Sequence, residues 1–146
     1  MNRWLAFCAL LVLPWALSAQ QDQPANSLLL VAKPELADRN FASTVVLVTQ
    51  AEDGSTVGVI LNRPTQLKLQ DFLAREFPTE NYKDPIYVGG PVMRRAVVAV
   101  FRSESTPRAP AFHVLKNLYL TMHPDNIRRL LAGPAARYRI YAGFSG

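Results

Sequence analysis

Cysteine is almost absent from this sequence of 146 residues, and the single one, Cys8, lies in an apolar run near the N-terminus. The bulky Phe7 precedes it where a lipoprotein signal has a small residue, so we expect no lipid anchor. The 146 − 19 = 127 residues after position 19 contain no cysteine, which excludes a disulfide, a thiol nucleophile and a cysteine-based metal site there. Stability must therefore come from an apolar core, and a chain of this length buries enough surface to form one.

Histidine is also scarce, with only His113 and His123. His113 lies among apolar residues, which favours a packed strand residue over a ligand. His123 precedes Pro124 and Asp125, and it either caps a helix or orients Asp125. The sequence has no Gly-x-Ser-x-Gly, His-Glu-x-x-His, Gly-x-Gly-x-x-Gly or phosphate-binding glycine loop with lysine. We therefore predict no catalytic residue, no metal ligand and no cofactor.

An apolar run of fourteen residues, 4–17, follows the short positive start that ends at Arg3. Small residues come after it, up to Ala19, which is the layout of a secretory signal peptide. A membrane span needs roughly 20 apolar residues, so a cleaved signal over residues 1–19 is favoured over an uncleaved membrane anchor. We expect a periplasmic or secreted protein in which residues 20–27 are a flexible lead-in and residues 28–146 form one domain.

Acidic residues are sparse in the C-terminal half. Residues 20–85 contain six Lys/Arg and nine Asp/Glu, whereas residues 86–146 contain nine Lys/Arg and two Asp/Glu. Such asymmetry is typical of a surface for anionic partners, or of a dipolar fold whose halves neutralise each other, and both interpretations stay open. Nucleic acid is not expected as a partner, because the basic residues are scattered rather than gathered on one predicted helix.

Strands dominate the predicted elements, and Asp53-Gly54 between two of them indicates a β-hairpin. The first strand is wholly apolar and is expected to be buried. The predicted strands are residues 28–32, 44–49, 56–61, 86–88, 96–101, 112–122 and 138–144.

Two helices are predicted between these strands. The first covers residues 65–77, with an apolar face that includes Leu69 and Phe77, and Pro78 ends it. The second opens at residues 123–125 and runs through Leu131. This order of elements predicts an α+β domain with a mixed sheet, a β-hairpin and two helices.

Several stretches resemble the YqgE/AlgH family, UPF0301, in order and spacing. They are an opening strand at residues 29–34, an entry to the hairpin at 38–47, Gly-x-Ile-x-Asn-Arg-Pro at 58–64, Gly-Gly-Pro-Val at 89–92 and Tyr-Ala-Gly-Phe at 141–144. The resemblance implies an α+β fold with a partly barrel-like sheet. The family is largely uncharacterised, with a proposed regulatory link to alginate production in some bacteria. Its members are generally cytoplasmic and continue past the last strand into a helical segment, whereas this sequence stops at Gly146.

Two turns are the best candidate for a binding site: Asn62-Arg63-Pro64 and Gly89-Gly90-Pro91. Arginine offers a fork of donors to a carboxylate or phosphate, and a double glycine lets main-chain N–H groups turn toward an anion. In the competing structural interpretation Asn62 closes a turn, Arg63 is solvated and the glycines allow a tight bend.

The predicted function is a non-catalytic module that binds a small anion or a protein partner near these turns. The alternatives are a regulatory protein like AlgH and a hydrolase with an unrecognised site. The last strand places Ile140 and Phe144 near the end of the sequence with nothing to cover them, which predicts a homodimer through this side.

Overall fold

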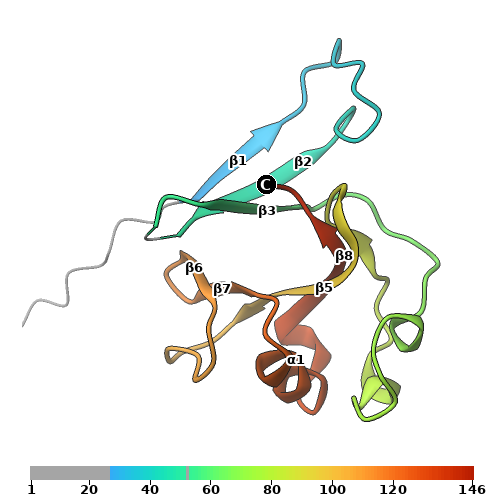
Figure 1. The fold of residues 1–146 in the computed structure, drawn as a ribbon, viewed down its shortest axis with the longest axis vertical. Coiled ribbons are helices and arrows are strands. Elements are labelled where there is room, and N and C mark those ends of the chain that lie inside the picture. The colour runs from blue at the N-terminus through green and yellow to red at the C-terminus, as the bar shows by residue number, and fades with distance from the viewer. Residues whose placement is uncertain (1–26, 52) are drawn as a thin grey trace, which may run out of the picture.

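The computed structural model describes residues 27–51 and 53–146. The predicted signal peptide and the lead-in up to residue 26 lie outside the described residues. The described chain forms eight strands in two sheets, one α-helix and three short 3-10 turns (Figure 1). The α+β class with a mixed, partly barrel-like sheet is confirmed.

The first sheet has three antiparallel strands in the order β1 (Ser27–Val31), β2 (Val45–Gln50) and β3 (Thr56–Ile60). The predicted hairpin joins β2 to β3, and Gly54 adopts a φ of 83° in its turn. A positive φ costs glycine little, because glycine has no Cβ to meet the following carbonyl oxygen. The turn chemistry visible in the sequence therefore produces this hairpin.

The second sheet has five strands in the order β4-β8-β5-β7-β6, and it is mixed because β4 runs parallel to β8 while the other pairs are antiparallel. Its strands are β4 (Tyr87–Val88), β5 (Val92–Arg102), β6 (Phe112–Leu115), β7 (Leu118–Thr121) and β8 (Tyr138–Phe144).

The two sheets are joined at one edge, where β3 meets the end of β8. The N–H of Gly58 donates to the carbonyl of Ser145 at 2.5 Å, and the N–H of Ser145 donates back at 2.8 Å. The N–H of Ile60 donates to the carbonyl of Gly89 at 2.9 Å. These bonds fold the first sheet over the second and give the partly barrel-like shape.

Two apolar clusters form the core. The first lies between the second sheet and helix α1 (Pro124–Leu131), and it contains the fully buried Leu131 and Ile140. The second cluster joins the two sheets, with Val59 of β3 packed against Val98 and Tyr141. In Figure 1 β1 lies at the top and α1 at the bottom, so the core runs between the two sheets and on to the helix. No helix within residues 27–51 and 53–146 is long and apolar enough to cross a membrane.

The predicted helix over residues 65–77 is wrong. Its only regular structure is the 3-10 turn Leu69–Asp71, and a second such turn, Thr79–Asn81, follows. The N–H of Thr65 donates to the carbonyl of Ile86 at 2.8 Å, so the segment begins as a neighbour of β4. An isolated helix of about twelve residues is marginal in water. Long-range bonds and the burial of Leu69 therefore decide its conformation.

Three other expectations need correction. The first strand forms, but its apolar residues 28–31 are exposed, because within the described chain no layer covers them. The single strand predicted over residues 112–122 is the hairpin of β6 and β7, which turns at Lys116 with a φ of 28°. Ile140, expected to be uncovered, is fully buried, and Phe144 is half-buried.

Candidate functional site

Asn62 follows β3 and fastens the loop that leads into β2. Its Oδ1 accepts from the N–H of Val45 at 2.9 Å, and its Nδ2 donates to the carbonyl of Ser43 at 3.0 Å. The side-chain oxygen and the side-chain nitrogen of Asn62 are therefore both hydrogen-bonded to main-chain groups. Asn62 therefore links the end of β3 to the loop before β2.

Arg63 lies beside this loop and holds it as well. Its Nη1 donates to the carbonyl of Asn40 at 2.6 Å, and its Nη2 donates to the carbonyls of Ala42 at 2.9 Å and Arg39 at 3.5 Å. These bonds occupy three of the five N–H donors of a guanidinium. Arg63 is half-buried rather than freely solvated, and it combines a structural role with a positive charge beside a cavity.

The double glycine brings β4 against the end of β8. The N–H of Gly89 donates to the carbonyl of Ala142 at 2.8 Å, and its carbonyl accepts from Ser145 Oγ at 3.0 Å. A Cβ on Gly89 would overlap the carbonyl oxygen of Gly143, and one on Gly90 would overlap that of Phe144. The main-chain N–H and carbonyl groups of Gly89 therefore both take part in hydrogen bonds within the fold.

A cavity of about 330 Å³ lies next to these turns. Of the six predicted site residues it is lined by three, Arg63, Gly90 and Pro91. Asn62, Pro64 and Gly89 are not among its lining residues. The cavity also adjoins Asn40 and Arg94, together with the apolar Ile60, Leu67, Val88 and Ala142. Among the described residues that line it, none is acidic and two are arginines.

Arg94 is the residue that sequence reasoning missed. Val92 pairs with Phe144 and Val97 with Ala142, so residues 93–96 of β5 lie opposite Gly143 alone. Such a bulge bends a strand and re-aims its side chains, and bulges are frequent next to functional sites. The only signal in the sequence is the arginine pair at 94 and 95, shortly after Gly-Gly-Pro-Val.

Neither histidine has the surroundings of a catalytic base. His113 is exposed, its Nε2 lies 2.8 Å from the carbonyl of Lys116, and its ring stacks on Tyr119 with centroids 5.0 Å apart. His123 caps α1, because its Nδ1 accepts from the N–H of Asp125 at 3.3 Å. Within the described residues no group of three or more His, Cys, Asp or Glu side chains could hold a metal ion.

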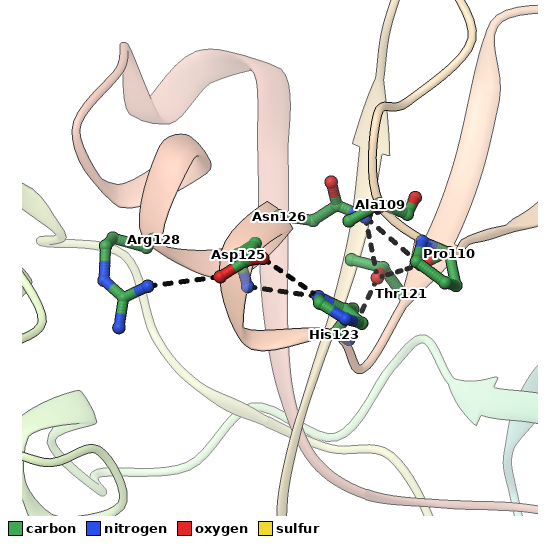
Figure 2. A network of polar contacts seen from close by, with 7 residues as sticks. All are labelled: Ala109, Pro110, Thr121, His123, Asp125, Asn126 and Arg128. Carbon is green, nitrogen blue, oxygen red and sulfur yellow. Dashed lines mark hydrogen bonds and ion pairs between the residues drawn. The ribbon is translucent and has the colours of Figure 1, made fainter.

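Figure 2 shows the polar network at the start of α1. The buried Asn126 directs its Nδ2 to the carbonyls of Ala109 and Pro110 and to Thr121 Oγ1, at 3.1, 3.2 and 3.1 Å. The hydroxyl of Thr121 donates to Pro110 at 2.9 Å and accepts from the main-chain N–H of His123 at 3.1 Å. The network thus ties the loop before β6 to the helix.

The same network contains a hydroxyl, an imidazole and a carboxylate, but they do not form a nucleophilic triad. Thr121 contacts the main chain of His123 rather than its ring, and the ring Nδ1 lies 3.9 Å from the carboxylate of Asp125. Asp125 also pairs with Arg128 at 3.3 Å on the exposed side of α1 (Figure 2). A triad needs the base within hydrogen-bond reach of the hydroxyl, so this arrangement is structural.

Two stacked tyrosines in the core have raised pKa values. Burial raises the pKa of Tyr82 to about 12, and its hydroxyl donates to the carbonyl of Pro85 and accepts from the N–H of Ile140. Burial also raises the pKa of Tyr138, whose hydroxyl has no hydrogen-bond partner within the described chain. Both phenols stay protonated at neutral pH, so neither provides a base there.

Comparison with known proteins shows the family. Residues 29–146 match the AlgH-like family model, DUF179. A UPF0301 protein of Rhodococcus jostii is 30% identical over 125 residues, which cover 81% of this chain and 60% of that protein. UPF0301 proteins of Mycobacterium tuberculosis and Pseudomonas putida are 31% identical, over 81% and 80% of this chain and 60% and 64% of their own lengths. The chain thus spans about 60% of the length of these relatives.

Two solved structures share the fold. The solution structure of the AlgH protein from Pseudomonas aeruginosa has a TM-score of 0.62 and 24% identity, covering 86% of this chain and 70% of that one. The X-ray structure of a protein from Corynebacterium diphtheriae has a TM-score of 0.58 and 23% identity, covering 85% of this chain and 66% of that one. With the family model matching most of the chain, the protein belongs to the AlgH-like family, UPF0301.

Proposed function

We propose that this protein is a non-catalytic binding module that takes an anionic group in the cavity between Arg63 and Arg94. The observation that carries the proposal is the lining itself: two arginines, Arg63 and Arg94, and Gly90 line one cavity of about 330 Å³. A cavity with two cations and no acidic side chain among its described lining residues favours a carboxylate or a phosphate over a neutral ligand.

The two arginines have different roles in this proposal. Arg63 already holds the loop that contains Asn40, so it is fixed in place before a ligand arrives. Arg94 is exposed on the bulge of β5 and supplies the second charge. Preorganised donors lose little conformational entropy on binding. Arg63 therefore provides the main contact to the anion, and Arg94 adds a second charged contact.

The same lining argues against a reaction. The polar side chains at the cavity are those of Asn40, Arg63 and Arg94. General acid–base catalysis needs a titratable group whose pKa lies near the working pH, and guanidinium and carboxamide groups do not meet that need. Binding without chemistry is therefore the function that these residues support best.

Phosphate and acetate are suitable probes, because they represent the two anion classes. We expect titration with either anion at low ionic strength to shift the amide resonances of Gly90 and Arg94. Arg94→Gln should weaken binding by about tenfold, the loss of one charge-assisted hydrogen bond, ~1.4 kcal/mol. Arg63→Gln is unsuitable, since it also releases the loop.

Arg95→Gln is the matched control. Arg95 is the neighbouring exposed arginine on β5 and does not line the cavity, so the variant removes the same net charge. It should bind both anions as tightly as the parent protein. Equal loss of anion affinity in the two variants would show that binding depends only on the overall charge of the protein. An amide resonance of Gly90 that does not shift during the titration would show that the anions bind elsewhere.

A further inference from the structure

Strand β1 exposes large apolar side chains on both of its faces. Leu28, Leu29, Leu30 and Val31 are 67%, 62%, 52% and 71% exposed. Residues 27–31 contain no charged residue and no proline, which are the usual devices that keep an edge strand from pairing with another chain. Its apolar faces and unprotected edge together mark β1 as an interaction surface.

β1 is also the open edge of its sheet. The opposite edge strand, β3, is joined to the second sheet through Gly58 and Ile60. Among the described residues β1 pairs with β2 alone (Figure 1). The hydroxyl of Ser27 donates to the carbonyl of Val114 in β6, so the start of the strand is anchored to the rest of the fold. β1 is therefore paired and anchored within a single copy of the chain.

The hydrogen-bond pattern shows which main-chain groups face outward. The N–H of Ala32 donates to the carbonyl of Thr44 at 2.9 Å, and this pair continues the β1–β2 register one step beyond Val31 and Val45. Because inward and outward pairs alternate in antiparallel sheets, Leu28 and Leu30 direct their main-chain groups toward β2. Three residues direct theirs to the open edge: Ser27, Leu29 and Val31.

We propose that the partner at this edge is a second copy of the chain, with two β1 strands paired antiparallel about a two-fold axis through Leu29. In this register Leu29 pairs with Leu29 of the second copy, and Ser27 pairs with its Val31. Every outward N–H and C=O group of β1 then finds a partner. The two sheets become one continuous six-stranded sheet. This proposal is independent of the anion site.

The side chains suit the same arrangement. Leu28 of one copy lies opposite Leu30 of the other, so apolar residues face each other across the strands, and no like charges meet. Each face of β1 borders an apolar groove: one of about 750 Å³ is lined by Leu30 with its β2 partner Val46, and one of about 670 Å³ by Leu29 with its β2 partner Leu47. A specific interface buries roughly 800 Å² per partner, and the groove walls add apolar area to that of the strand.

Sedimentation velocity over a range of protein concentrations tests the association, with protein purified after expression of the full chain. We expect a dimer that dissociates on dilution. Leu29→Pro removes an N–H that faces the open edge and leaves the bonds to β2 in place, and Leu29→Lys puts a charge on the axis. Both should give a monomer with a native circular dichroism spectrum.

Met93→Lys is the matched control, because Met93 is 68% exposed and lies on β5, away from this edge. It should dimerise like the parent. A parent protein that stays monomeric at all concentrations overturns the proposal, as does equal dimer loss in Met93→Lys.

Cysteine cross-linking tests the register, with Cys8→Ser in every sample. Partners in a hydrogen-bonded antiparallel pair have Cα atoms about 5.5 Å apart, within the range of a disulfide. Leu29→Cys should therefore form a covalent dimer on mild oxidation, and Val31→Cys should not. A mixture of the Ser27→Cys and Val31→Cys proteins should cross-link. If Val31→Cys cross-links with itself as readily as Leu29→Cys, the proposed axis is wrong.

Discussion

Burial of phenol groups makes single residues of this protein sensitive to alkaline pH. Tyr82 and Tyr138 stack with ring centroids 5.6 Å apart, and burial raises both pKa values. Below pH 10 the phenol of Tyr82 is protonated in the folded and the unfolded chain, so its contribution to stability is unchanged. Between pH 10 and about 12 the unfolded chain releases the proton while the folded chain retains it. Fewer protons are then bound in the unfolded state, and the free energy of unfolding falls as pH rises.

We therefore expect stability to decline between pH 10 and 12, with Tyr82 accounting for about 2 kcal/mol of the loss. Urea denaturation at several pH values measures it. Tyr82→Phe should flatten the decline in part, because Tyr141, whose pKa burial also raises, still contributes with Tyr138. At neutral pH this variant should lose about 1 kcal/mol, since the N–H of Ile140 loses its acceptor. An identical slope in the variant would contradict the assignment to Tyr82.

At the scale of elements, the hairpin of β2 and β3 depends on its turn. Gly54 has a φ of 83° with nothing within 4 Å of an added Cβ, so backbone conformation rather than space restricts the position. The carboxylate of Asp53 accepts from the N–H and the hydroxyl of Ser55, which holds the pKa of Asp53 below its usual value. These local bonds help to define the turn.

Gly54→Val should destabilise the protein by about 1–2 kcal/mol, because a β-branched residue is strained at this φ. Gly54→Asn is the control, since asparagine tolerates a positive φ better than other residues. Thermal melting of the two variants measures the difference. A melting temperature that valine leaves unchanged would show that the turn relaxes without cost.

At the scale of the whole molecule, the route of the protein through the cell remains a prediction from residues 1–19. Their positive start, apolar run and small residues lead us to expect export and cleavage. Mass spectrometry of a periplasmic extract should find a chain that begins at Ala19 or Gln20. An intact Met1 in the membrane fraction would instead support the uncleaved anchor.

The sequence by itself determined the family, the α+β class, the β2–β3 hairpin, the start of α1 after its cap His123 and the last strand, which is observed at Tyr138–Phe144 as predicted. These features depend on turn residues, caps and periodic apolar residues that act over a few positions. Such signals are readable locally, whatever the rest of the chain does.

Tertiary structure alone decided what depends on distant contacts. The apolar residues within 65–77 recur at helical spacing. The hydrogen bond from the N–H of Thr65 to the carbonyl of Ile86 and the burial of Leu69 nevertheless hold this segment in turns. An apolar strand such as β1 is buried only if another layer covers it, and within the described chain none does. Arg63 reaches loop carbonyls more than twenty residues away, and a bulge in β5 puts Arg94 on the same cavity. These outcomes follow from which segments meet in space, and this information is spread over the whole chain.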